Sequence, residues 1–156
     1  MFIVAPTDLE WYAYQKSNRF IDRINFWTPS DWKFKALKPG EKVVFKLKGP
    51  GEPKAGGYGT FIEYKFQSIE DCWKEFGCRN GFSDITSFKA ALGRYNSESS
   101  STGIGCIVLS DVVYFDAPVT LIDKGIVFKN STVKYAKYST VFPFDSTSSS
   151  PTTAFT

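Results

Sequence analysis

Two stretches of the chain alternate between apolar and polar residues, and this pattern predicts β-strands with one buried face. In residues 42–48 the two faces are Val43, Phe45 and Leu47 against Lys42, Val44, Lys46 and Lys48. Residues 60–66 alternate in the same way. The first of these strands is therefore expected to present a basic face to solvent.

Shorter apolar runs predict further strands. They occupy residues 2–5, 24–27, 112–115, 119–122 and 132–138. Residues 104–109 are apolar without interruption, which predicts a strand covered on both faces. Residues 49–59 contain five glycines and two prolines and are expected to form a loop between two strands of one sheet.

Helical periodicity and capping residues predict three helices. Thr7 and Glu10 have the spacing of a capping box, which places the first helix from there to about residue 18. Ser68 is the expected N-cap of the second helix, and Gly77 is its expected end. The third helix is predicted over residues 84–95.

The order of these elements indicates one α+β domain with a barrel-like sheet. A length of 156 residues suits a single domain. The domain is expected over residues 1–145, and residues 146–156 are expected to be a disordered Ser/Thr-rich tail. Residues 97–102 are predicted to be a polar loop.

Composition narrows the chemistry. Aromatic residues make up 17% of the chain, more than a core of this size needs, so some rings are expected at a surface or in a pocket. The chain has no histidine, the usual general base near neutral pH, and no catalytic residue is assigned. Three cysteines without a C-x-x-C pair favour reduced thiols in the cytoplasm over a metal site, and no cofactor is expected. No apolar run approaches the length of a membrane span.

A net charge of +3 is a mild basic bias, which permits nucleic-acid binding through a local patch but does not require it. Aromatic and polar residues that could hold a base are Asn25, Trp27, Ser30, Asp31, Trp32 and Tyr58. Lysines, an arginine and glycines that could meet a phosphate backbone are Lys46, Lys48, Lys54, Gly56, Gly57 and Arg79.

Each of these features also has a purely structural interpretation. Trp27 and Trp32 would serve equally well as core anchors, and lysines on a strand are often only solvated. Arg79 lies in a glycine-flanked connection between two predicted helices. A different class of function, a metal-dependent nuclease, is suggested by Glu63 and Lys65, two residues apart on a strand.

An ordered series of segments resembles a known family. The series comprises residues 24–30, 35–48, 56–61, 72–77, 80–81 and 104–109, within a resemblance that covers roughly residues 1–138. It is similar to the N-terminal domain of HNH-type restriction endonucleases, a PUA-like domain grouped with the SRA, YTH, EVE and ASCH domains. The match is looser in the glycine-rich segment, which follows residues 50–54.

The resemblance implies a small twisted β-barrel with two or three flanking helices. It also implies recognition of a modified base, with 5-methyl- or 5-hydroxymethylcytosine in duplex DNA flipped into an aromatic pocket. A separate HNH nuclease, through which the protein would form a homodimer, would then cut the DNA. Since an HNH nuclease needs histidines, this chain is expected to be a truncated or free-standing recognition module. The alternatives are an RNA- or nucleotide-binding PUA-like module and a protein-interaction domain.

Overall fold

The computed structural model describes residues 1–95 and 103–144, which form six strands in one mixed sheet and three α-helices. The sheet order is β2-β5-β4-β3-β1-β6. The strands are β1 (Phe2–Thr7), β2 (Ile24–Thr28), β3 (Lys42–Leu47), β4 (Lys54–Gln67), β5 (Ile104–Thr120) and β6 (Ala136–Tyr138). The helices are α1 (Leu9–Ser17), α2 (Ile69–Phe76) and α3 (Ile85–Tyr95), with short 3-10 turns η1 (Gly77–Asn80) and η2 (Leu121–Lys124). The predicted α+β class with a twisted sheet and flanking helices is confirmed.

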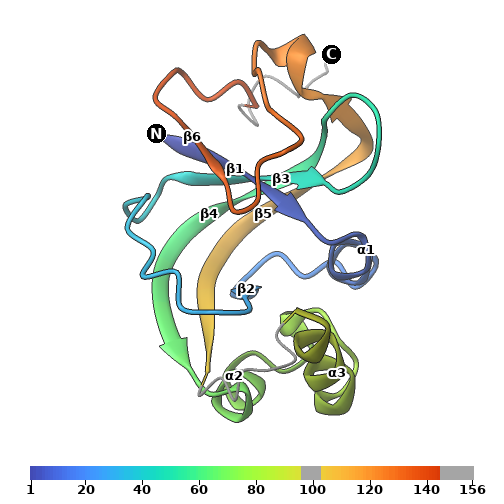
Figure 1. Cartoon of the computed structure of the whole chain (residues 1–156), viewed down its shortest axis with the longest axis vertical. Helices are drawn as coiled ribbons and strands as arrows, with labels where there is room; N and C mark the ends of the chain where they lie inside the picture. Colours follow the sequence, from blue (N-terminus) through green and yellow to red (C-terminus); the bar gives the residue numbers. More distant parts are fainter. Residues whose placement is uncertain (96–102, 145–156) are drawn as a thin grey trace.

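The antiparallel pair β4 and β5 forms the long, strongly bent centre of the sheet (Figure 1). The prediction of a loop over residues 49–59 is wrong in its second half, because β4 already begins at Lys54. Residues 112–115 and 119–122 were predicted as two strands, but residues 112–120 all belong to the single strand β5, and Leu121 and Ile122 begin the turn η2. Three register shifts between β4 and β5 allow both strands to bend without ending, and such bulges increase local twist.

β1 and β3 pair in parallel, and both are buried on both faces. The predicted basic outer face of β3 is therefore wrong: Val44 is fully buried, and Lys46 is only 5% exposed. The reason is remote in sequence, since the chain after β5 passes back over this side of the sheet (Figure 1). That segment forms one apolar cluster with β1 and β3. The cluster includes Leu121, Ile126, Phe128 and Phe144 from the segment, and Phe2, Val4 and Val44 from the strands.

The helix boundaries follow the capping residues closely, with one shift. Asp8, not the predicted Thr7, caps α1, because Thr7 is still the last residue of β1 and its hydroxyl donates to the carbonyl of Ala5. Ser68 caps α2 through the N–H of Asp71, and Gly77 ends it with a positive φ of 53°, as predicted.

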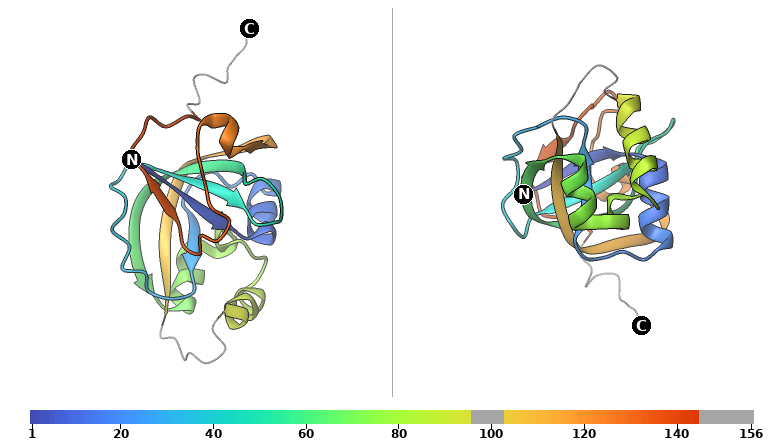
Figure 2. Two further views of the ribbon diagram at one scale, coloured as in Figure 1. Left: turned by 45° about the horizontal axis from the view of Figure 1, so that its top comes forward. Right: turned by 90° about the horizontal axis from the view of Figure 1, so that it is seen from below.

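α2 and α3 lie near the end of β4 and the start of β5 (Figure 1). There they cover another apolar cluster, which includes Cys72, Phe88 and Cys106. Viewed from that end in Figure 2, α1 and α3 lie on the same side of the molecule. β6 is shorter than the predicted strand over residues 132–138. The predicted loop at 97–102 and tail at 146–156 lie outside the described residues. Within the described ranges, no helix is long and apolar enough to cross a membrane.

Candidate nucleic-acid interface

A pocket of about 350 Å³ opens where the start of α1, the end of β2 and the end of α3 converge. Six aromatic side chains line it, together with three basic residues, one carboxylate and small or aliphatic residues. The full lining is Pro6, Thr7, Asp8, Trp11, Phe26, Trp27, Pro29, Ser30, Trp32, Lys48, Phe82, Ala91, Arg94, Tyr95, Val133 and Lys134. We call this the aromatic pocket.

The rings of the aromatic pocket hold one another in place. Trp27 meets Tyr95 nearly edge-on, with centroids 6.0 Å apart and an interplanar angle of 83°. Trp27 also contacts Phe82 at 6.1 Å, and Trp11 packs edge-on against Phe26 at 5.3 Å. Edge-to-face pairs of this kind are favourable arrangements of aromatic quadrupoles. The pocket therefore has a preformed apolar interior.

Three cations surround the aromatic pocket. The ammonium of Lys48 lies 5.4 Å from the centroid of the Tyr95 ring and donates to its hydroxyl at 3.3 Å. Lys134 lies over the ring of Trp32 at 5.5 Å. Arg94 pairs with Glu10 at 3.7 Å, and both partners are largely exposed. This placement combines positive charge with aromatic faces at one opening.

The loop after β2 supplies Pro29, Ser30 and Trp32 to the pocket, and a hydroxyl from β4 anchors it. The hydroxyl of Tyr64 donates to the Asp31 carboxylate at 2.6 Å and accepts the backbone N–H of Trp32 at 3.0 Å. Burial and the nearby Asp31 carboxylate raise the pKa of Tyr64 to about 12. The same hydrogen bond, with the backbone N–H of Lys33, lowers the pKa of Asp31. The Tyr64 hydroxyl therefore stays protonated and the Asp31 carboxyl stays ionised through the neutral pH range.

The predicted base-holding residues divide into two groups. Trp27, Ser30 and Trp32 line the aromatic pocket, whereas Asp31 stands behind it as the partner of Tyr64. Asn25 and Tyr58 lie elsewhere in the protein.

Asn25 is fully buried, where its amide donates to the Asn80 side chain at 2.8 Å and to the Cys106 thiol at 3.4 Å. Tyr58 is 4% exposed and packs against Phe142 and Phe144, on the other side of the sheet. Neither residue is a pocket-lining residue.

Of the predicted backbone contacts, Lys48 alone lines the aromatic pocket. Burial, with a smaller contribution from Lys48, lowers the pKa of Lys46. Lys54 is exposed at the start of β4, beside a second, more open cavity of about 470 Å³. Arg79 donates to the carbonyl of Asp22 at 3.0 Å, and its guanidinium lies 4.6 Å from the centroid of the Phe20 ring.

Gly56 and Gly57 are inside the protein and serve packing. The Tyr12 hydroxyl donates to the carbonyl of Gly56 at 2.7 Å, and a Cβ on Gly56 would meet the Tyr12 ring at 2.6 Å. A Cβ on Gly57 would lie 2.0 Å from the carbonyl oxygen of Val113. These glycines therefore permit close strand and helix packing, a role distinct from the predicted approach of a phosphate.

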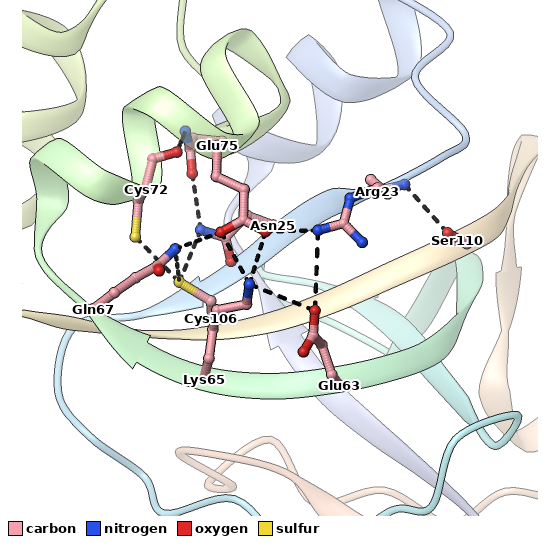
Figure 3. Close-up of polar contacts among 10 residues, drawn as sticks. Arg23, Asn25, Glu63, Lys65, Gln67, Cys72, Glu75, Cys106 and Ser110 are labelled. Carbon is pink, nitrogen blue, oxygen red and sulfur yellow. Dashed lines mark hydrogen bonds and ion pairs between the residues drawn. The ribbon is translucent and has the colours of Figure 1, made fainter.

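Glu63 and Lys65 belong to an ion-pair network, shown in Figure 3, that joins β4 to α2. Glu75 of α2 is its centre, accepting from Lys65 at 2.8 Å, from Arg23 at 2.6 Å and from Gln67 at 3.0 Å. Among the residues the structure describes, no three His, Cys, Asp or Glu side chains come together in a way that could hold a metal ion.

Two buried thiols lie beside this network. The sulfur atoms of Cys72 and Cys106 are 3.2 Å apart, and Gln67 lies within 4.0 Å of the Cys106 sulfur (Figure 3). All three cysteines of the chain are free.

Sequence reasoning missed most of the aromatic pocket. Trp11 and Tyr95 fall within predicted helices that carry no predicted site, and no pattern in the sequence singles out Asp8, Phe26, Phe82, Arg94 or Lys134 as site residues. The only signal that pointed here was the aromatic density after β2. The other walls come from residues 6–11, from Lys48, and from residues 82–95 and 133–134, which no local pattern links to β2.

No protein-family model matches the chain, and no curated protein matches its sequence. Solved structures share its fold. ASCH from Zymomonas mobilis aligns with a TM-score of 0.58 at 12% identity, covering 87% of each chain. The N-terminal domain of Staphylothermus marinus McrB aligns with a TM-score of 0.58 at 13% identity, covering 88% of this chain and 87% of that one. The chain therefore has the α+β fold of ASCH and PUA-like structures, as the sequence resemblance implied.

Proposed function

We propose that this chain is a DNA-recognition module that binds a modified base, flipped out of a duplex, in the aromatic pocket. The observation that carries the proposal is the combination of six aromatic side chains and three cations around one cavity of about 350 Å³. A flipped base needs flat apolar walls to replace the stacking it has left, and its flanking phosphates need positive charge close by.

The residues take separate roles in this proposal. Trp27, Trp32 and Tyr95 hold the base, since aromatic stacking contributes about 1–3 kcal/mol per base by alanine substitution. Lys48, Arg94 and Lys134 neutralise the flanking phosphates. Ser30, exposed at the mouth of the pocket, reaches polar atoms of the ligand.

The preferred target is cytosine with a 5-methyl or 5-hydroxymethyl group, which is the target that the sequence resemblance implies. In this role the chain recognises foreign modified DNA and directs a separate HNH nuclease to it. The chain itself then acts as a binding module, and the proposal assigns no catalytic residue to it.

The test is a binding screen against duplexes of one sequence that differ only in a single cytosine, at matched ionic strength. The proposal expects tighter binding when that cytosine carries a 5-methyl or 5-hydroxymethyl group. Equal binding of plain and modified duplexes would contradict the modified-base assignment. Single-stranded RNA that outcompetes every duplex would instead indicate an RNA-binding module.

A further inference from the structure

We propose that Asp8 reads the exocyclic amino group of the base, so that the aromatic pocket selects an amino-bearing pyrimidine over one with a carbonyl at the same ring position. This inference rests on the proposed function and names the chemical feature that the pocket recognises. It assigns a specificity role to a residue that otherwise serves as a helix cap.

Among the residues that the structure describes, Asp8 is the one carboxylate that lines the aromatic pocket. Its Oδ2 atom accepts the backbone N–H groups of Glu10 and Trp11 at 3.1 and 3.2 Å, as an N-cap does. For its other oxygen, Oδ1, the described part of the chain provides no hydrogen bond or ion pair. The cap bonds fix the side chain, so Oδ1 is a positioned acceptor at the pocket wall.

The surrounding charges leave this oxygen available. Arg94 pairs with Glu10, Lys48 donates to the Tyr95 hydroxyl, and Lys134 lies over the Trp32 ring. Each nearby cation therefore has another partner, and a donor from a bound base would complete the hydrogen bonding of Asp8. Half-burial of Asp8 among aromatic rings strengthens such a bond relative to water.

An ionised carboxylate accepts hydrogen bonds but cannot donate them, and this determines which base Asp8 prefers. Cytosine presents an amino group at C4, and acidic side chains are suited to accept from it. Uracil and thymine present a carbonyl oxygen at the same position, which would face the carboxylate as a second acceptor and leave both groups unsatisfied. Asp8 therefore favours modified cytosine and disfavours modified uracil of equal size.

Two pairs of duplexes isolate this feature. In each pair the 5-substituent is the same and only the group at C4 differs. The pairs are 5-methylcytosine against thymine, and 5-hydroxymethylcytosine against 5-hydroxymethyluracil. In every duplex the opposite strand carries an abasic site at that position, so that neither base is paired. The wild-type chain is expected to bind the cytosine member about tenfold or more tightly in at least one pair, which is the scale of one good base contact.

Asp8→Ser and Asp8→Asn are the matched variants, because serine and asparagine both cap helices well and should keep the thermal midpoint near wild type. Asp8→Ser is expected to reduce the cytosine preference to about threefold or less. Asp8→Asn should reduce it too, because an amide supplies a donor as well as an acceptor.

The outcomes separate this inference from the proposed function. A preference that survives in both folded variants overturns the role of Asp8, and so does a wild-type chain that binds both members of each pair equally but loses binding in Trp27→Ala. Neither result would contradict the proposed binding of a modified base in the aromatic pocket. If the wild-type chain binds no modified duplex, the proposed function and this inference both fall.

Discussion

The hydroxyl of Tyr64 and the carboxylate of Asp31 lie 2.6 Å apart and join strand β4 to the loop that carries Trp32. The backbone N–H of Trp32 donates to the same hydroxyl. Gly105 makes room for this arrangement, since a Cβ there would lie 2.6 Å from the Tyr64 oxygen. Asp31, which resembled a base-reading residue in the sequence, is thus placed to orient a wall of the pocket.

Tyr64→Phe should therefore weaken base discrimination without removing any pocket-lining atom. The variant loses two hydrogen bonds to the loop, at a cost of roughly 1–2 kcal/mol in unfolding free energy. We expect the affinity ratio between modified and plain duplexes to fall about fivefold, because Trp32 is no longer fixed for stacking.

Tyr114→Phe is the matched control for this prediction. The Tyr114 hydroxyl donates to the carbonyl of Phe20, outside the aromatic pocket, so its loss should lower stability comparably and leave discrimination unchanged. Chemical denaturation and duplex titration of both variants give the two quantities. Equal loss of discrimination in both would show that general loosening, and not the position of Trp32, matters.

Local signals in the sequence predicted the class of most elements, but they could not predict which segments pack on those elements in the fold. Ser68 and Gly77 bound α2 correctly because caps act within a few residues. Alternation in β3 separated its two faces, but it could not reveal that residues between Leu121 and Phe144 pack on Val44. The same limitation applies to the site: Trp27 and Trp32 come from one stretch, whereas Tyr95 reaches them through the tertiary fold alone.

Stacking and charge should separate in binding experiments. Trp27→Ala is expected to abolish the preference for a modified base, because it removes a wall of the pocket. Lys48→Ala should weaken binding to modified and plain duplexes alike and reduce the slope of log affinity against log salt by about 1, as loss of one phosphate contact does.

Lys124→Ala, which removes an exposed charge on η2 outside the aromatic pocket, is the charge-matched control. It should leave both the affinities and the salt slope near wild type. A loss in this variant as large as in Lys48→Ala would indicate that net charge alone drives binding.

The glycines of β4 are expected to be structural. Gly57→Ala would bring a Cβ to 2.0 Å from the carbonyl oxygen of Val113 in the paired strand, so the β4–β5 ladder must shift. We expect a loss of about 2–4 kcal/mol in unfolding free energy, the scale of a severe core substitution. Gly93→Ala is the opposite control: nothing lies within 4 Å of its added Cβ, and alanine in a helix should stabilise α3 by about 0.5–1 kcal/mol. Thermal unfolding of the two variants should move in opposite directions.

Acid stability should depend on Glu75, the centre of the network between α2 and β4. Burial tends to raise the pKa of Glu75, but its bonds with Lys65, Gln67 and Arg23 outweigh this and lower the pKa overall. A carboxyl group whose pKa is lower in the folded state stabilises the fold above its unfolded pKa, and this contribution is lost as pH falls through the folded value. Glu75→Gln should thus cost about 1 kcal/mol near pH 7, a modest figure because the ion pairs are partly solvated. The difference in unfolding free energy from wild type should disappear at acid pH.

Glu63→Gln tests the same network through a more exposed carboxylate, whose ion pairs are longer, at 3.5 and 4.0 Å. This variant should therefore cost less unfolding free energy than Glu75→Gln. Urea unfolding across pH 3–7 provides the measurement, and a Glu75→Gln deficit that persists unchanged at the acid end would show that shape, not charge, is what the side chain contributes.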